Sequence, residues 1–151
     1  MYAALASVVL LLALAVGGED AIGLPTTQLT VETTSGPKKF SVEVASDPAS
    51  QQRGLMFRRS LSPNAGMLFA FHSSASLSFW MKDTFLSLDM LFIRSDGTIA
   101  SIASSTTPLS TTPIRSTEPV RAVLEINGGR AYELGIRPGD RVRATIFHNE
   151  Y

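Results

Sequence analysis

The feature that most constrains the fold is a series of short segments in which apolar and polar residues alternate with a period of two. In the stretch QLTVETTSGPKKFSVEVA, Phe40, Val42 and Val44 alternate with Ser41 and Glu43, and a Gly-Pro break separates this run from a similar one before it. A period of two places alternate side chains on opposite faces of a β-strand, and Gly-Pro favours a turn. The pattern therefore predicts a β-hairpin.

Other short segments have the same strand character. They comprise residues 66–71, 77–85, 89–94, 98–104, 120–126 and 141–147. Two segments are instead typical of short helices: DPASQQRG, with Asp47 as N-cap and Gly54 at the end, and GGRAYELGI, which ends near Gly135. Tight turns are expected at Asp96-Gly97 and at Pro138-Gly139. Short strands joined mostly by such turns predict a mainly β fold, a small antiparallel β-barrel or sandwich with two short inserted helices.

The N-terminal residues differ from the rest of the chain. Residues 3–16 are apolar or small, a run too short to span about 30 Å of hydrocarbon comfortably but typical of a signal peptide. No Lys or Arg precedes Lys38, and a buried N-terminal helix is the alternative. We expect a signal peptide or anchor in 1–18, a linker in 19–28, one β-rich domain in 29–147 and a tail in 148–151. The expected location is periplasmic or extracellular, either free or tethered by an uncleaved N-terminal segment.

Composition excludes several classes of function. The 13 basic and 13 acidic side chains balance, which argues against nucleic-acid binding. The chain has no Cys, which excludes disulfides, zinc–thiolate sites and Cys nucleophiles, and its two His residues are far apart. We expect no cofactor, no metal, no integral membrane domain after removal of the leader, and a monomer.

The segment FWMKDTFLSLDM holds the most distinctive candidate residues. As a strand, residues 79–85 would direct Phe79 and Met81 into the core and place Trp80, Lys82 and Thr84 on the opposite face. Trp80 beside Lys82 could then stack a flat or sugar-like ligand while the ammonium holds an anionic group. The alternative is that Trp80 belongs to the core and Lys82 extends along it to solvent.

Three further charged residues are candidates. Arg58 offers a planar fork for a carboxylate or phosphate, and Asp89 and Glu125 lie within apolar runs. Burial of an isolated charge is costly, so such acids are either paired or functional. One alternative is a structural ion pair of Arg58 with Asp89 or Glu125. Another is an acid–base enzyme that uses Asp89 and Glu125, although no nucleophile motif supports catalysis.

A copper site is a further alternative. Thioethers are soft ligands, and Met56, Met67, Met81 and His72 could converge on Cu(I) with Trp80 as a cap. The chain has no M-x-x-M cluster, and Met residues in strands more often fill the core.

Four blocks of the sequence, RGLMFRRSL, GMLFAF, FWMKDTFLSLDMLFI and VLEINGG…LGIRPGD, resemble the bacterial and archaeal family named domain of unknown function 192. The resemblance covers residues 29–147 and implies a compact, mostly β domain, often exported, with no established activity. Asp83 stands where family members often have Asn. The recurring residues that neither backbone geometry nor packing explains are Met56, Arg58, Trp80, Met81, Lys82, Thr84, Asp89 and Glu125.

Together these observations predict an exported, non-enzymatic binding module with a small cleft for a polar or anionic ligand, including a carbohydrate-like one. The cleft residues are expected to be Arg58, Trp80, Lys82, Thr84, Asp89 and Glu125. A structural or protein-interaction domain of the cell envelope is the main alternative, and it would present an exposed apolar patch or strand edge instead of a cleft.

Overall fold

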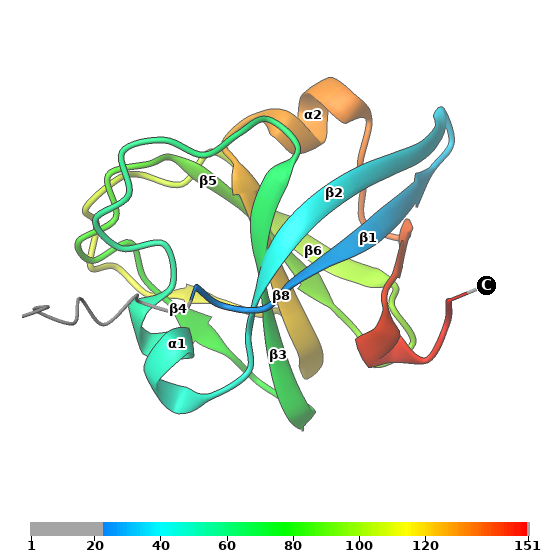
Figure 1. Cartoon of the computed structure of the whole chain (residues 1–151), viewed down its shortest axis with the longest axis horizontal. Helices are drawn as coiled ribbons and strands as arrows, with labels where there is room; N and C mark the ends of the chain where they lie inside the picture. The colour runs from blue at the N-terminus through cyan, green and yellow to red at the C-terminus, as the bar shows by residue number, and fades with distance from the viewer. Residues whose placement is uncertain (1–22, 151) are drawn as a thin grey trace, which may run out of the picture.

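The structure is a computed structural model that describes residues 23–150 (Figure 1). Its main sheet contains β1 (Thr26–Thr33), β2 (Gly36–Ala45), β3 (Ala65–Ala75), β5 (Leu88–Ile93), β6 (Ile99–Ala103), β8 (Val120–Asn127) and β9 (Arg141–Arg143). A separate ribbon pairs β4 (Ser78–Phe79) with β7 (Ile114–Arg115). The helices are α1 (Pro48–Arg53) and α2 (Arg130–Leu134), and a 3₁₀ turn spans Thr145–Phe147.

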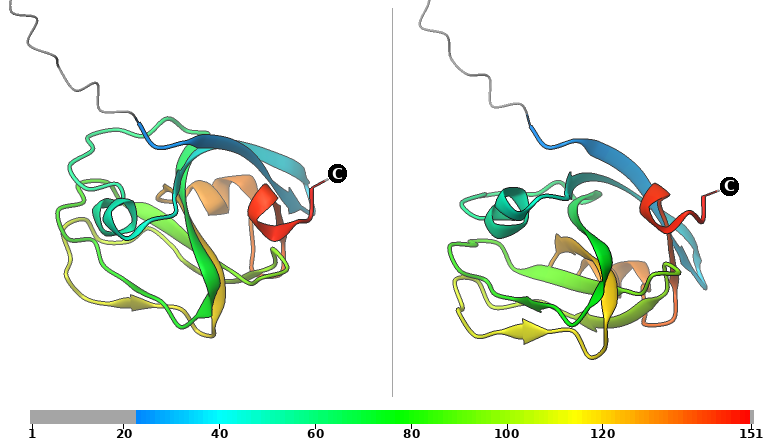
Figure 2. Two further views of the ribbon diagram at one scale, coloured as in Figure 1. Left: turned by 60° about the horizontal axis from the view of Figure 1, so that its bottom comes forward. Right: turned by 90° about the horizontal axis from the view of Figure 1, so that it is seen from below.

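The seven strands of the main sheet run in the order β6-β5-β8-β3-β2-β1-β9. All neighbours are antiparallel except β2 and β3, whose parallel connection contains α1. The sheet curls into a half-barrel, and the two ends approach each other where Thr98 forms a bridge with Arg141 and the Ile99 amide donates to the Asp140 carbonyl at 2.9 Å. Figure 2 shows β1 on one side of the molecule and β7 on the other. The predicted mainly β fold with two short helices is confirmed.

The alternation along the strands creates two apolar clusters on opposite faces of the sheet. The first gathers residues from strands along the whole sheet, such as Val31, Leu91 and Leu124, and so fills the concave side. The second, with Met67 and Phe92, covers the other face of β3, β8 and β5 beneath α1 and the β4–β7 ribbon. Two cores on one sheet explain why β5 is buried at every position.

Several local predictions are confirmed, because they rest on short-range chemistry. Asp47 caps α1 by accepting from the Ser50 amide at 3.0 Å, and Gly54 ends the helix with a φ of 48°. Gly97 has a φ of 90° in the turn before β6, and Gly139 has a φ of 95° in the turn after α2. These positive φ values favour glycine over residues with a Cβ.

Two predicted strands are wrong in their extent. Residues 80–85 are not a strand: β4 ends at Phe79, and the Thr84 amide donates to the Met81 carbonyl at 3.1 Å in a turn. Asp83 within this turn has a φ of 53°, a conformation that Asp and Asn tolerate. The last strand is also shorter than expected, because the Asn149 side chain bonds the Val142 carbonyl and the Ala144 amide, backbone groups at its end.

The predicted signal peptide or anchor, residues 1–18, and the first part of the predicted linker lie outside the described residues. Within residues 23–150, none of the helices is long and apolar enough to cross a membrane. The first strand begins at Thr26, so the last part of the predicted linker belongs to β1 and pairs with β2.

Candidate functional site

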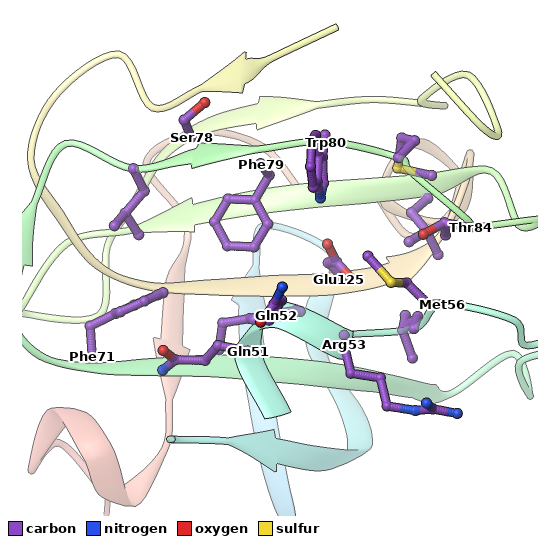
Figure 3. Close-up of a pocket in the computed structure, with 16 residues that line it drawn as sticks. Gln51, Gln52, Arg53, Met56, Phe71, Ser78, Phe79, Trp80, Thr84 and Glu125 are labelled. Atoms are coloured by element: carbon purple, nitrogen blue, oxygen red, sulfur yellow. The ribbon is translucent and has the colours of Figure 1, made fainter. Parts of the chain in front are cut away.

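The second apolar cluster contains a cavity of about 250 Å³ that opens between α1, the end of β4 and the convex face of the sheet (Figure 3). Its apolar walls include Leu55, Met56, Phe69, Phe79, Trp80 and Met81. Its polar lining includes Gln51, Gln52, Arg53, Thr84 and Glu125. The volume approaches the lower end of the range for small-molecule sites, which are mostly apolar with a few polar groups.

Glu125 is the polar residue at the base of this cavity. Alternation along β8 directs it to the same face as Val123, and its sheet neighbours are Met67 on β3 and Met90 on β5. Glu125 is only 4% exposed, and no group of residues 23–150 donates a hydrogen bond to its carboxyl. Burial raises its pKa from 4.5 to about 8. The carboxyl is therefore mostly protonated at neutral pH and lacks a partner from the protein.

Trp80 forms part of the wall above Glu125. It follows β4 directly and is 47% exposed, so its ring is available to a molecule that enters the cavity. Phe79 beside it is held by edge-to-face contacts with Phe69 and Phe92, at centroid distances of 5.1 and 6.2 Å. In Figure 3 the Glu125 carboxyl points into the space bounded by Trp80 and Phe79. The site therefore combines a buried acid with two aromatic rings.

Lys82 and Thr84 lie next to Trp80, but residues 81–84 form a turn, so the predicted strand face is wrong. The Thr84 hydroxyl lines the cavity but donates to the Lys82 carbonyl at 3.0 Å, which fixes the turn. The Lys82 ammonium lies 5.3 Å from the centroid of the Trp80 ring and lines an adjacent hollow with Arg53 and Met56. Lys82 is thus near the cavity mouth rather than inside it.

Arg58 is held away from the cavity. It forms a two-pronged ion pair with Glu43 on β2, whose second contact, from Nη2 to Oε1, measures 2.9 Å. The suggested ion pair of Arg58 with Asp89 or Glu125 is therefore wrong. The guanidinium stabilises the connection between β2 and β3, and it does not line the cavity.

Asp89 is a structural residue. It is fully buried, and its carboxylate accepts hydrogen bonds from the amides of Ser105, Gly129 and Ala131 at 2.7 to 2.9 Å. These bonds fix the start of α2 and the loop after β6. Asp89 shares a face of β5 with Leu91, whereas Glu125 lies on the opposite face of the sheet. The suggested acid–base pair of Asp89 and Glu125 is wrong for this reason.

The sulfur residues are only partly brought together. Met56 and Met81 line the cavity with Trp80, but Met67 is sealed in the core and His72 is exposed near the end of β3. The structure therefore does not assemble the suggested Cu(I) set. Within residues 23–150, no three His, Cys, Asp or Glu residues cluster to hold a metal.

Sequence reasoning missed the contribution of α1 to the site. Gln51 anchors this helix to the sheet by donating to the Ala45 and Ala70 carbonyls at 3.3 and 2.9 Å, and Gln52 extends toward the Glu125 carboxyl in Figure 3. The sequence contained an indication of this contribution, because the helix PASQQR has no apolar face to bury. A polar helix that lies against a sheet has polar groups to offer a ligand.

Comparison with known proteins identifies similar crystal structures and a family. One similar crystal structure is that of a protein from Sinorhizobium meliloti 1021 that is proposed to be a transcription regulator. The two sequences are 43% identical, and the match covers 83% of this chain and 98% of the S. meliloti chain with a TM-score of 0.80. A crystal structure of a protein of unknown function from Novosphingobium aromaticivorans DSM 12444 is 41% identical, covers 83% and 89% of the two chains, and also has a TM-score of 0.80.

No curated protein matches the chain. The sequence model of the DUF192 family, described as an uncharacterized ACR, matches residues 29–144, which span most of the described structure. The chain therefore belongs to the DUF192 family.

Proposed function

We propose that this domain is a non-enzymatic binding module and that its ligand, a small polar molecule, occupies the cavity between Glu125 and Trp80. The observation that carries the proposal is the Glu125 carboxyl, which is buried at a cavity without a hydrogen-bond partner from residues 23–150. The carboxyl lines the cavity, so a ligand there can supply the hydrogen-bond partner that the described residues do not.

The walls of the cavity restrict the shape and charge of the ligand. Trp80 and Phe79 offer ring faces to a flat or ring-shaped body, such as that of a sugar. An anionic group would fit only at the mouth, near Arg53 and Lys82, because Glu125 at the base offers no positive charge. The balanced charge of the chain argues against extending the description of the S. meliloti protein to this chain.

Binding without catalysis agrees with the lining of the cavity. Glu125 is the only acid among the described residues that line it, and no His joins it there. General acid–base catalysis commonly needs a second group to receive or return a proton. A single buried carboxyl is better suited to recognition.

The experiment that tests this proposal is a ligand screen of the full chain by thermal shift, with Trp80 fluorescence recorded in parallel. A ligand at 100 times its Kd should stabilise the fold by about 2.7 kcal/mol. Glu125→Gln should abolish the effect of a true ligand, whereas Glu133→Gln, on the exposed side of α2, should not. A ligand whose effect survives Glu125→Gln would place binding elsewhere.

We also propose that the protein is exported as a monomer and acts in the periplasm or outside the cell, either free or tethered. The apolar run of residues 3–16 followed by Gly17-Gly18 and two acids supports export. Fractionation and the mass of the purified mature protein test this directly. Full-length protein in the cytoplasmic fraction would contradict it.

A second candidate function, an interaction domain for an acidic protein, is favoured by one surface. Phe57, Trp80 and Phe85 are 53%, 47% and 44% exposed, and each ring is stacked by a cation: Arg53, Lys82 and Arg59 respectively. Exposed aromatics flanked by cations suit an acidic partner. Loss of salt-sensitive binding to acidic peptides in Arg59→Ala, with no effect of Glu125→Gln, would support this candidate over the cavity.

A further inference from the structure

Resting on the proposed function, we propose that the cavity ligand is a small organic cation, a protonated or quaternary amine whose charge pairs with the Glu125 carboxylate while its apolar part packs against Phe79 and Trp80. The charge, the size and the walls of the cavity each support this class of ligand.

The charge within the cavity is one-sided. Several elements contribute the residues that surround Glu125. They are Met67 and Phe69 of β3, Leu88 and Met90 of β5, Gln51, Gln52 and Arg53 of α1, Met56 after α1, Phe79 of β4, and Trp80 and Thr84 after β4. Among these described residues only Arg53 is charged besides Glu125. The Arg53 guanidinium stacks on Phe57, 5.7 Å from the ring centroid, and extends away from Glu125 in Figure 3.

The Glu125 carboxyl therefore has no cation from the described residues to neutralise it. A buried carboxylate without a partner is costly, whereas a bound ammonium would make its ionised form favourable. An anion would face an acid with no positive charge beside it. A neutral ligand could accept a hydrogen bond from the protonated carboxyl, but it would not gain the charge–charge attraction.

The aromatic walls add a second attraction for a cation. The faces of Trp and Phe rings carry negative electrostatic potential and attract ammonium groups by roughly 0.5–2 kcal/mol. Trp80 already attracts one cation in this structure, the Lys82 ammonium at 5.3 Å. Phe79 is fixed by its contacts with Phe69 and Phe92, so this part of the wall is preformed. A cavity of about 250 Å³ is large enough for a small amine.

Proton release should accompany binding. Burial raises the pKa of Glu125 to about 8, so below that pH a cation must displace one proton. The apparent Kd should then fall about tenfold for each pH unit between 6 and 7 and level off above about pH 8. An amine that stays charged across this range isolates the titration of Glu125.

The test uses three probes of nearly the same shape: tert-butylammonium, tert-butanol and pivalate, titrated into the full chain by calorimetry and Trp80 fluorescence. We expect only the cation to bind. Its apparent Kd should fall about tenfold per pH unit between pH 6 and 7, and binding should release about one proton below pH 7. Glu125→Gln should remove binding while the circular dichroism spectrum is retained, and Glu133→Gln should leave it intact. The pH dependence of the apparent Kd in the unmodified chain tests the role of Glu125 without a substitution.

Other outcomes separate the two proposals. If tert-butanol or pivalate binds as tightly as the cation, and Glu125→Gln abolishes that binding, the inference of a cationic ligand fails and the proposed function stands. If the cation binds with no pH slope and no dependence on Glu125, it occupies the exposed aromatic surface and the inference fails. If none of the three probes binds at concentrations up to the mM range, both proposals fail.

Discussion

Replacement of Glu125 by Gln should remove an unusual contribution to the pH dependence of stability. Most carboxyl groups in folded proteins have a pKa at or below the unfolded value, so their contribution to stability increases as pH rises. Glu125 does the opposite, because burial raises its pKa from 4.5 to about 8. Between these values the folded chain holds a proton that the unfolded chain has released, and the folded state becomes less stable as pH increases.

The magnitude follows from the size of the pKa change. Each pKa unit corresponds to about 1.4 kcal/mol, so ionisation of Glu125 in the folded protein is disfavoured by about 5 kcal/mol in total. The contribution of Glu125 is fully present below pH 4.5 and is lost by about pH 8. Gln has nearly the same shape as the protonated acid and does not titrate. The variant should therefore match the parent near pH 4.5 and exceed its stability progressively at higher pH.

The assay is urea unfolding followed by circular dichroism at half-unit steps from pH 4.5 to 8.5. The relevant quantity is the free energy of unfolding of Glu125→Gln minus that of the parent, because all other titrating groups are common to both chains. Glu133→Gln, on the exposed surface of α2, is the matched control and should not gain stability relative to the parent as pH rises toward 8.5. A difference for Glu125→Gln that is independent of pH would refute the account of Glu125 as a buried, unpartnered acid.

Three other changes test the remaining structural assignments by unfolding measurements. Asp89→Asn should destabilise the fold by about 2 kcal/mol, since it disrupts three buried backbone hydrogen bonds; unchanged stability would contradict the structural role. Gly66→Ala should destabilise the fold by about 1–3 kcal/mol, because the new Cβ would press on the Glu125 carbonyl and lie 3.1 Å from Ile126 Cγ2. An unchanged Tm would refute this packing. Arg58→Ala should cost about 1 kcal/mol or less and lose its effect at high salt, whereas a large loss independent of salt would show that Arg58 has another role.

The sequence predicted those parts of the fold that depend on neighbouring residues. The cap at Asp47 and the turns at Gly97 and Gly139 form because a few adjacent side chains and backbone angles decide them. The segment after Phe79 was misread because an alternating pattern over six residues is also compatible with a turn. Met81 and Thr84 are both buried there, and a separation of three residues fits a turn rather than a strand.

The candidate site shows a different limit of sequence reasoning. Asp89 and Glu125 give the same signal, an acid in an apolar run, yet one is bonded to three amides and the other has no partner within residues 23–150. The difference comes from the pairing register of β5 and β8, which places the two side chains on opposite faces of the sheet. Long-range register depends on contacts across the whole sheet. The residue pattern could therefore identify both acids but could not separate the structural one from the one that lines the cavity.

The most direct measurement is a carbon-13 NMR titration of the Glu125 side-chain carboxyl, assigned with Glu125→Gln, in the free chain and with saturating tert-butylammonium. The account predicts an inflection near pH 8 in the free chain, where burial leaves the carboxyl without a partner. It also predicts a shift to clearly lower pH with the cation, since pairing favours the carboxylate. An inflection near pH 4.5 in the free chain, or one that the cation leaves unchanged, would contradict the assignment of this cavity as a cation-binding site.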